Sequence, residues 1–248
     1  MGQMLERIEE YWTNRAEGYS QVNQEELATD QKNRWLRALE AEFPHRAPKN
    51  IKVLDIGTGP GFFAIILARA GYQVTAVDYT EEMLCKAKEN AGRFADRIHW
   101  MRMDAQKLEL PDNQFDVAVS RNLTWNLENP DEAYKEWKRV LKPGGVLLNF
   151  DGDYGKEEFT EEMESLPADH AHRQLSCGQL KECDKIKDQL PISAMRRPAW
   201  DVEVLKNLGC VDVTVDSEVY RRVYASEDSP FYNPTPIFRL QARKTGKR

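Results

Sequence analysis

A cluster of glycines and a carboxylate falls where apolar segments of the sequence end. Gly57, Gly59 and Gly61 follow the apolar segment 51–56 and open a helical pattern. A glycine loop between a strand and a helix lets a ligand approach the backbone closely, and the helix N-terminus offers it N–H groups. Asp78 ends the next apolar segment, where a carboxylate can accept hydrogen bonds from the hydroxyls of a ribose. This pattern predicts a site for a cofactor that contains a nucleoside.

The glycine loop alone does not choose between nucleoside cofactors. Counted from Gly59, the sequence matches the dinucleotide pattern Gly59-x-Gly61-x-x-Ala64, whereas the count from Gly57 fails at the third position. Asp55, two residues before the first glycine, lies at the end of the predicted buried strand. A carboxylate there suits a ligand with an ammonium group, such as an amino-acid tail, and a dinucleotide offers no cation at that point. Asp55 therefore favours a cofactor with an amino-acid tail.

The elements that position this loop alternate between strand and helix. Short apolar or β-branched segments predict strands over 51–56, 72–78, 97–103, 114–120, 146–150, 211–217 and 237–244. Helical patterns lie between them over 61–71, 80–94, 130–141 and 199–209. Strict alternation predicts right-handed crossovers, and therefore an α/β fold with a doubly wound, mostly parallel sheet covered on both faces.

Two stretches fall outside this alternation. Residues 1–44 are amphipathic and helical in pattern, and we expect them to form an N-terminal helical lid. Residues 151–198 show helix-like pieces without a strand, and we expect an acidic cover over the substrate. Within it, residues 151–190 hold 11 acidic and 5 basic side chains, which accounts for the formal charge of −6 of the whole chain. The cofactor-binding core is then 45–150 with 199–248, in a single domain.

Composition limits the compartment and the partners. The longest apolar run, 62–68, is far shorter than the roughly 18 residues of a membrane span. The polar N-terminus lacks a signal-peptide pattern, and the 4 cysteines form no CxxC pair. The acidic balance argues against a general nucleic-acid binder. We expect a soluble cytoplasmic protein without a nucleic-acid or membrane partner, and the sequence leaves its oligomeric state open.

The segments around the loop resemble the successive motifs of the class I S-adenosylmethionine-dependent methyltransferases of the small-molecule type. The similar segments, in order, are VLDIGTGPGFFA, VTAVDYT, MRMDAQKLELPDNQFDVAVS and EWKRVLKPGGVLLNF. The resemblance is continuous over roughly residues 51–150 and extends plausibly to 244. It implies a Rossmann-like sheet of seven strands whose last strand is antiparallel. It also implies S-adenosyl-L-methionine as the cofactor and S-adenosyl-L-homocysteine as its product.

The resemblance further implies roles for individual residues. The glycines would line the methionine portion with Asp55 at its amino group, and Asp78 would hold the ribose. Tyr79 and Met83 would flank the adenine, and Asp104 with Ala105 would meet its edge. The segment YWTNRAEGYS resembles the lid helix of small-molecule members. The predicted cofactor residues are therefore Tyr11, Arg15, Tyr19, Asp55, Gly57, Thr58, Gly59, Gly61, Asp78, Tyr79, Met83, Asp104, Ala105 and Arg121.

Methyl transfer from a sulfonium is an in-line displacement that needs no nucleophilic residue and no metal. The protein must mainly hold donor and acceptor aligned while it excludes water. Asn122 stands, like Arg121, where the resemblance places residues between cofactor and substrate. Trp125 could line the cavity or simply pack, and Asp151 and Tyr154 could orient or deprotonate an acceptor. These four, Asn122, Trp125, Asp151 and Tyr154, are the catalytic candidates.

Two other groups of residues in the sequence could form ligand sites. His170, His172, Cys177 and Cys183 gather possible metal or metalloid ligands, but their spacing does not match closed zinc sites, and no metal is predicted. Arg196 and Arg197 could bind an acidic group or could be a solvated pair.

The sequence therefore favours a methyltransferase that acts on a small-molecule acceptor. The acidic cover favours a neutral or cationic acceptor. The alternatives are an NAD(P)-dependent oxidoreductase and a catalytically silent protein that binds or senses S-adenosylmethionine.

Overall fold

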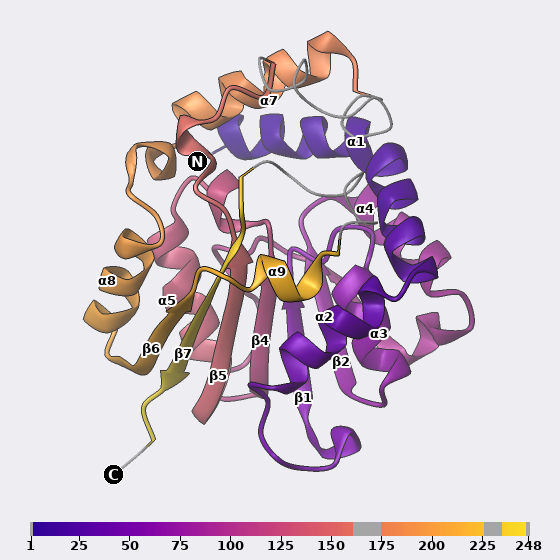
Figure 1. Cartoon of the computed structure of the whole chain (residues 1–248), viewed down its shortest axis with the longest axis vertical. Coiled ribbons are helices and arrows are strands. Elements are labelled where there is room, and N and C mark those ends of the chain that lie inside the picture. Colours follow the sequence, from indigo (N-terminus) through magenta and orange to yellow (C-terminus); the bar gives the residue numbers. More distant parts are fainter. Residues whose placement is uncertain (1, 161–174, 226–234, 247–248) are drawn as a thin grey trace.

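The computed structural model describes residues 2–160, 175–225 and 235–246. In these residues seven strands form one sheet in the order β3-β2-β1-β4-β5-β7-β6 (Figure 1). The strands are β1 (Lys52–Ile56), β2 (Gln73–Asp78), β3 (Ile98–Arg102), β4 (Phe115–Arg121), β5 (Leu141–Asp151), β6 (Cys210–Asp216) and β7 (Phe238–Lys244).

The pairing of the strands confirms the predicted sheet. β1 lies between β2 and β4 and is parallel to both. β7 is antiparallel to β5 on one side and to β6 on the other. The predicted strand 146–150 is longer than expected, because β5 begins at Leu141 and bends where its register against β4 shifts. The sheet is thus mostly parallel with an antiparallel last strand.

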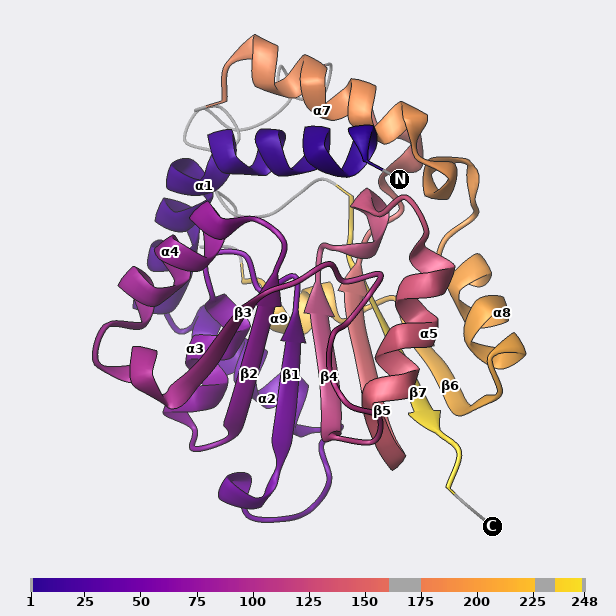
Figure 2. The ribbon, with the colours of Figure 1, turned by 180° about the vertical axis from the view of Figure 1, so that it is seen from behind.

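Helices cover both faces of the sheet (Figures 1 and 2). On one face lie α2 (Gln31–Glu40), α3 (Phe62–Arg69) and the short α9 (Tyr220–Val223). On the other face lie α5 (Pro130–Val140) and α8 (Ala199–Asn207), while α4 (Glu81–Ala91) packs beside β2 and β3. Short 3₁₀ turns connect these elements: η1 (Pro48–Asn50), η2 (Gly92–Arg97), η3 (Thr124–Asn126), η4 (Tyr154–Lys156) and η6 (Pro191–Ala194).

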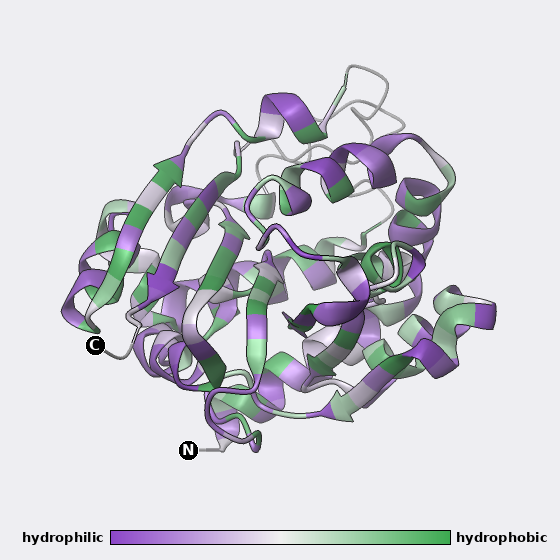
Figure 3. Ribbon diagram, turned by 90° about the horizontal axis from the view of Figure 1, so that it is seen from below, coloured by the Kyte–Doolittle hydropathy of each residue, from purple (hydrophilic) through white to green (hydrophobic). Residues whose placement is uncertain are grey.

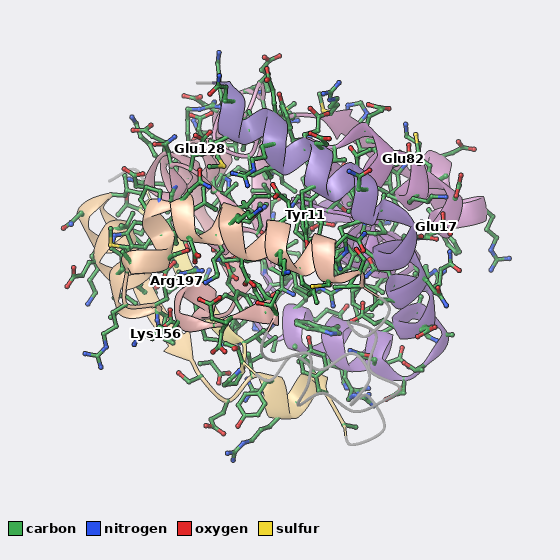
Figure 4. The ribbon with its side chains drawn as sticks, turned by 90° about the horizontal axis from the view of Figure 1, so that it is seen from above. Tyr11, Glu17, Glu82, Glu128, Lys156 and Arg197 are labelled. Atoms are coloured by element: carbon green, nitrogen blue, oxygen red, sulfur yellow. The ribbon has the colours of Figure 1, made fainter. Side chains whose placement is uncertain are left out.

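Two helices lie across the end of the sheet where the parallel strands finish. α1 (Gln3–Ala28) and α7 (Cys177–Gln189) run side by side there, with Tyr11 between them (Figure 4). A capping box of Ser176 and Gln179 begins α7, and Arg7 pairs with Glu182 at 2.6 Å across the two helices. The segments outside the alternation, 1–44 and the described part of 151–198, therefore meet above the strand ends.

The second helix of the N-terminal segment belongs to the core. Figure 3 shows hydrophobic residues on the strands and on the helices that pack against them, and α2 adds Trp35 to the packing on one face of the sheet. The Trp35 ring is fully buried and stands edge-on to Phe63 and Phe150, each 5.1 Å away between ring centroids. Residues 1–44 thus divide in space, with α1 over the sheet end and α2 against the sheet face.

Trp35→Ala is expected to lower the free energy of unfolding by about 3–5 kcal/mol, because it removes a fully buried ring between two aromatic neighbours. Arg37→Ala, on the exposed side of the same helix, should change it by less than about 0.5 kcal/mol. Urea unfolding followed by circular dichroism measures both. A loss at Trp35 as small as that at Arg37 would show that α2 does not stabilise the core.

Candidate functional site

A cavity lies at the carboxyl ends of β1, β2 and β4, beneath α1. Most of the predicted cofactor residues line it: Tyr19, Asp55, Gly57, Thr58, Gly59, Asp78, Tyr79, Met83, Asp104, Ala105 and Arg121. Tyr11, Arg15 and Gly61 do not. Leu5, Ile8, Glu9, Trp12 and Asn23 of α1 also line the cavity and were not predicted from the sequence.

The glycine loop turns the chain from β1 into α3 at the floor of this cavity. Gly57, Gly59 and Gly61 all have positive φ angles, of 65°, 53° and 92°. Gly61, predicted to line the cofactor, instead brings two helices together, because a Cβ there would lie 3.0 Å from the Cβ of Ala87 in α4. Gly57 and Gly59 are therefore the two glycines that give a ligand access to the backbone.

Asp55 is buried at the end of β1 and organises the loop. Its Oδ2 accepts the Thr58 hydroxyl at 2.6 Å and the Ala64 N–H at 2.9 Å. Burial raises the pKa of this carboxyl to about 7, and the hydrogen bonds from Thr58 and Ala64 oppose that shift. Both of these donors are uncharged, so a cationic ligand group would complete the surroundings of the Asp55 carboxylate.

Asp78 ends β2 on the other side of the loop. Its Oδ2 accepts the Gly59 N–H at 2.8 Å and its Oδ1 accepts the Thr80 N–H at 2.9 Å. Burial raises the pKa of Asp78 to about 6. The buried Asp55 and the half-buried Asp78 thus bracket one glycine loop within a single cavity.

The far side of the cavity is formed by the loops after β2 and β3. Tyr79, Met83, Asp104 and Ala105 line it there, as the resemblance implied. The guanidinium of Arg102 stacks 5.3 Å above the Tyr79 ring and pairs with Glu9 of α1 at 2.5 Å. This pair ties the roof of the cavity to the wall where adenine is expected.

The helix α1 presents a different set of side chains to the cavity than the sequence predicted. Tyr19 lines it, and burial raises the pKa of its hydroxyl. Tyr11 is instead buried against α7, where its hydroxyl accepts from Arg15 at 2.7 Å and contacts the Cys183 thiol. The expected placement of Tyr11 and Arg15 at the cavity is therefore corrected: both lie at the α1–α7 interface.

Arg121 lies at the inner end of the cavity and is paired. Its two terminal nitrogens each lie 2.9 Å from a carboxylate oxygen of Glu26, whose side chain is 4% exposed. Asn23 and Gln31 also donate to Glu26, and the guanidinium lies 4.4 Å from the centre of the Phe62 ring. Glu26 was missed in the sequence, because a helical glutamate carries no local sign of burial. The pair fixes the end of α1 to the end of β4.

Among the four catalytic candidates, Asn122 is the one that lines the cavity. Its φ of 54° places a non-glycine residue in the left-handed region, directly after β4. Its Oδ1 accepts the Tyr154 hydroxyl at 3.1 Å, and its carbonyl oxygen accepts the Trp125 indole N–H at 3.0 Å. Tyr154 and Trp125 are buried behind it, so they support the wall of the cavity rather than line it.

Asp151, the fourth candidate, is fully buried and does not line the cavity. Its Oδ2 lies 3.0 Å from Nη1 of Arg197 and accepts the Thr124 hydroxyl. This corrects two expectations: Asp151 is not placed to deprotonate an acceptor, and Arg197 is neither solvated nor open to an acidic ligand. Arg197 was recognisable in sequence only by Asp201, four residues later, with which it pairs at 2.7 Å.

The possible metal ligands do not converge in the described residues. His170 and His172 lie outside them. Cys177 is exposed on α7, whereas Cys183 is buried, and burial raises the pKa of its thiol to about 11. Across 2–160, 175–225 and 235–246, no three or more His, Cys, Asp or Glu side chains are arranged to hold a metal ion.

None of the helices described in those ranges has the length and apolarity needed to cross a membrane.

Comparison with known proteins identifies the part of the chain that carries this cavity. Residues 54–149 match the family described as methyltransferase domain. The matched segment begins within β1 and ends within β5. Its first strand, glycine loop and β4 supply the floor and inner wall of the cavity.

Relatives share this domain rather than the whole chain. The ubiquinone/menaquinone biosynthesis C-methyltransferase UbiE of Roseobacter denitrificans is 40% identical over 101 residues, 39% of this chain and 40% of UbiE. A demethylmenaquinone methyltransferase of Deinococcus radiodurans is 38% identical over 120 residues, 47% of this chain and 49% of that protein. The chain thus spans half or less of the length of these curated relatives.

Solved structures extend the likeness over most of the fold. A SAM-dependent methyltransferase from Aquifex aeolicus matches with a TM-score of 0.54 at 22% identity, over 84% of this chain and 89% of that one. An S-adenosylmethionine-dependent methyltransferase from Mesorhizobium loti matches with a TM-score of 0.58 at 18% identity, over 84% and 96%. At these identities the likeness shows the fold.

Asp55→Asn is expected to raise the melting temperature of the ligand-free protein at pH 8 and to change it little at pH 5. Since burial raises the pKa of Asp55 to about 7, the folded protein holds a proton that the unfolded chain releases near pH 4. The contribution of Asp55 to stability therefore falls as the pH rises from about 4 to 7. Asparagine does not ionise, and its carbonyl still accepts from Thr58 and Ala64. Thermal unfolding of both proteins at both pH values measures the difference, and a variant less stable than wild type at pH 8 would contradict it.

Proposed function

We propose that this chain transfers a methyl group from S-adenosylmethionine to a small-molecule acceptor. One observation carries the proposal: two carboxylates, the buried Asp55 and the half-buried Asp78, bracket a glycine loop inside a single cavity at the carboxyl edge of the sheet. The methyltransferase domain around them, residues 54–149, supports the same conclusion.

The residues present fit this cofactor. Asp55 would face the ammonium of the methionine portion, whose positive charge offsets the cost of burying the carboxylate. Asp78 would accept the ribose hydroxyls, and the faces of Tyr79 and Met83 would hold the adenine. Gly57 and Gly59 leave the backbone open beside the methionine portion. When bound, the cofactor supplies a methyl group on a sulfonium that an acceptor displaces in line.

The chain's own contribution is alignment and the exclusion of water. Trp12 and Tyr19 of α1 close the cavity from above, and Phe62 and Leu123 add apolar surface inside it. Holding two reactants in line in such a site is worth roughly 7–11 kcal/mol of the barrier. We assign α1 and the described part of the segment 151–198 to the roof of the site.

The acceptor side of the cavity favours an uncharged molecule with an apolar body. Apart from Asp55, Asp78 and Asp104, the charged residues that line the cavity are Glu9 and Arg121, and each is paired, Glu9 with Arg102 and Arg121 with Glu26. Asn122 and Asn126 offer amide groups that can hydrogen-bond a polar handle. Relatives named as quinone-biosynthesis methyltransferases are consistent with such an acceptor. The acceptor proposed is therefore neutral, which narrows the neutral or cationic range expected from the acidic cover.

Asp78→Ala is expected to weaken the binding of S-adenosylhomocysteine by about 10–100-fold, because a hydrogen-bond partner of the ribose is lost. Gly59→Val should also weaken it, since a branched side chain would stand between the loop and the ring of Tyr19. Gly92→Val is the matched control: Gly92 has a similar φ, 51° against 53°, but an added Cβ there meets nothing within 4 Å. Isothermal titration calorimetry measures all three.

Unchanged affinity in both cavity variants would contradict the proposed site. Stabilisation of the wild type by NAD and not by S-adenosylhomocysteine would favour an oxidoreductase. A protein that binds the cofactor but transfers no radiolabelled methyl group to a deproteinised metabolite extract would be a silent binding protein.

The affinity for S-adenosylhomocysteine is expected to rise by about tenfold or more between pH 5.5 and pH 8. Over this interval Asp55 and Asp78, with pKa values of about 7 and 6, lose their protons in the ligand-free protein. The ionised forms attract the ammonium and accept from the hydroxyls of the ligand. Titrations at several pH values test this, and Asp55→Asn should flatten the dependence. A dissociation constant independent of pH in the wild type would refute the assignment of Asp55.

A further inference from the structure

Arg197 lies behind the wall of the cavity and uses its donors on four other residues. Its side chain is 2% exposed. Nη1 lies 3.0 Å from Oδ2 of Asp151 and donates to the carbonyl oxygen of Gly152 at 3.3 Å. Nη2 donates to the Thr124 hydroxyl and to Asp201, each at 2.7 Å, and Nε donates to the same carboxylate at 3.0 Å. The planar fork of the guanidinium thus joins β5, η3 and α8.

The Asp151 side chain, which pairs with Arg197, also holds η3 by hydrogen bonds. Its Oδ2 accepts the Thr124 hydroxyl and, at 3.0 Å, the backbone N–H of Trp125. Its Oδ1 accepts the N–H of Gly152 at 2.9 Å. Because η3 is a single short turn, these contacts from Asp151 and Arg197 supply much of what fixes its position.

Trp125 connects η3 to the cavity. Its indole donates to the carbonyl of Asn122, and its ring stands 5.5 Å from Tyr154 and 6.5 Å from Trp12, between centroids. The neighbouring residues Asn122, Leu123, Asn126 and Leu127 line the cavity. A shift of Trp125 would therefore move the wall that faces the acceptor.

We propose that Arg197 is a positioning residue that sets the acceptor-side wall, residues 122–127, through Asp151 and Thr124. This inference rests on the proposed methyl transfer. It makes Arg197, which lies just before α8 at the end of the acidic segment 151–198, the link between that segment and the cavity. Lysine would keep the charge but, as a single ammonium, could not hold Asp151, Asp201 and Thr124 in one plane.

The first test is a spectroscopic one that needs no ligand. Protein labelled with 5-fluorotryptophan contains 6 tryptophans, whose fluorine resonances are assigned by Trp→Phe variants. In Arg197→Lys the Trp125 resonance is expected to shift or broaden, whereas those of Trp35 and Trp137, in the packing on the two faces of the sheet, stay in place. An unmoved Trp125 resonance would overturn the proposal.

Tyr134→Phe is the matched control. The Tyr134 hydroxyl belongs to the same buried network. It donates to Asp201 at 2.7 Å and accepts from Asn149 at 2.9 Å, and neither partner is a residue of η3. This variant should lower the melting temperature without moving the Trp125 resonance. If Tyr134→Phe shifts the Trp125 resonance as much as Arg197→Lys does, a general loss of stability explains both shifts and the proposal fails. Thr124→Val removes the hydroxyl that accepts from Nη2 of Arg197 and from Asn149 and that donates to Asp151. If Arg197→Lys does not fold, Thr124→Val must shift the Trp125 resonance and leave those of Trp35 and Trp137 in place for the proposal to stand.

The second test separates an effect on the acceptor-side wall from an effect on cofactor binding. Arg197→Lys should bind S-adenosylhomocysteine within about twofold of wild type. For Arg197→Lys, the concentration of deproteinised metabolite extract that gives half of the maximal transfer of radiolabelled methyl groups from S-adenosylmethionine should rise by about tenfold. A parallel loss of cofactor affinity would assign Arg197 to general stability and overturn its positioning role. Failure of the wild type to bind S-adenosylhomocysteine would instead refute the proposed function, while the fluorine spectra would still decide whether Arg197 positions the wall.

Discussion

The cavity end of this fold depends on two carboxylates, the buried Asp55 and the half-buried Asp78, at the points where neighbouring parallel strands stop. β1 is central, β2 lies on one side and β4 on the other, so the chain reverses its direction through the sheet beside β1. Such a switch point leaves a crevice at the carboxyl ends of the strands. Asp55 and Asp78 end β1 and β2 at that crevice, and the loop between β1 and α3 closes around them by hydrogen bonds from Ala64 and Gly59. The free protein keeps both carboxyl groups at raised pKa values, which a cationic ligand would relieve.

Charge elsewhere in the molecule is used to hold elements together. Some acidic side chains of the segment 151–198 make structural contacts. Glu182 pairs with Arg7 of α1, and Asp184 accepts the backbone N–H groups of Phe159 and Thr160. The Asp151–Arg197–Asp201 cluster has two carboxylates for one guanidinium, all nearly or fully buried. Such a cluster is weak support for stability in itself but costs much when one member is removed. Its value here lies in where it holds η3.

Much of the sheet was predictable because buried parallel strands appear in sequence as short continuous apolar runs. The cavity-lining residues after β1, β2 and β3 were predictable for the same reason, since their place follows from the ends of those runs. The face of α1 was not, because both of its sides are covered: the cavity takes Trp12 and Tyr19, and α7 takes Tyr11. Its amphipathic pattern therefore cannot say which aromatic side chain faces the ligand. Arg197 was misjudged because Asp151 and Thr124 lie far away along the chain.

The ion pairs that hold α1 over the cavity are exposed near the start and middle of the helix and buried near its end. Glu9–Arg102 and Glu17–Lys86 join exposed or half-exposed side chains, and solvent screening makes such pairs weak. Glu26–Arg121 is buried, carries extra hydrogen bonds from Asn23 and Gln31, and would leave an unpaired charge if it broke. Gly18, the poorest helix former within α1, lies between the two kinds of contact. The ion pairs that join α1 to α4 and to the end of β3 are thus more exposed than the pair that joins its end to β4, and the first part of α1 depends more on its packing against α7.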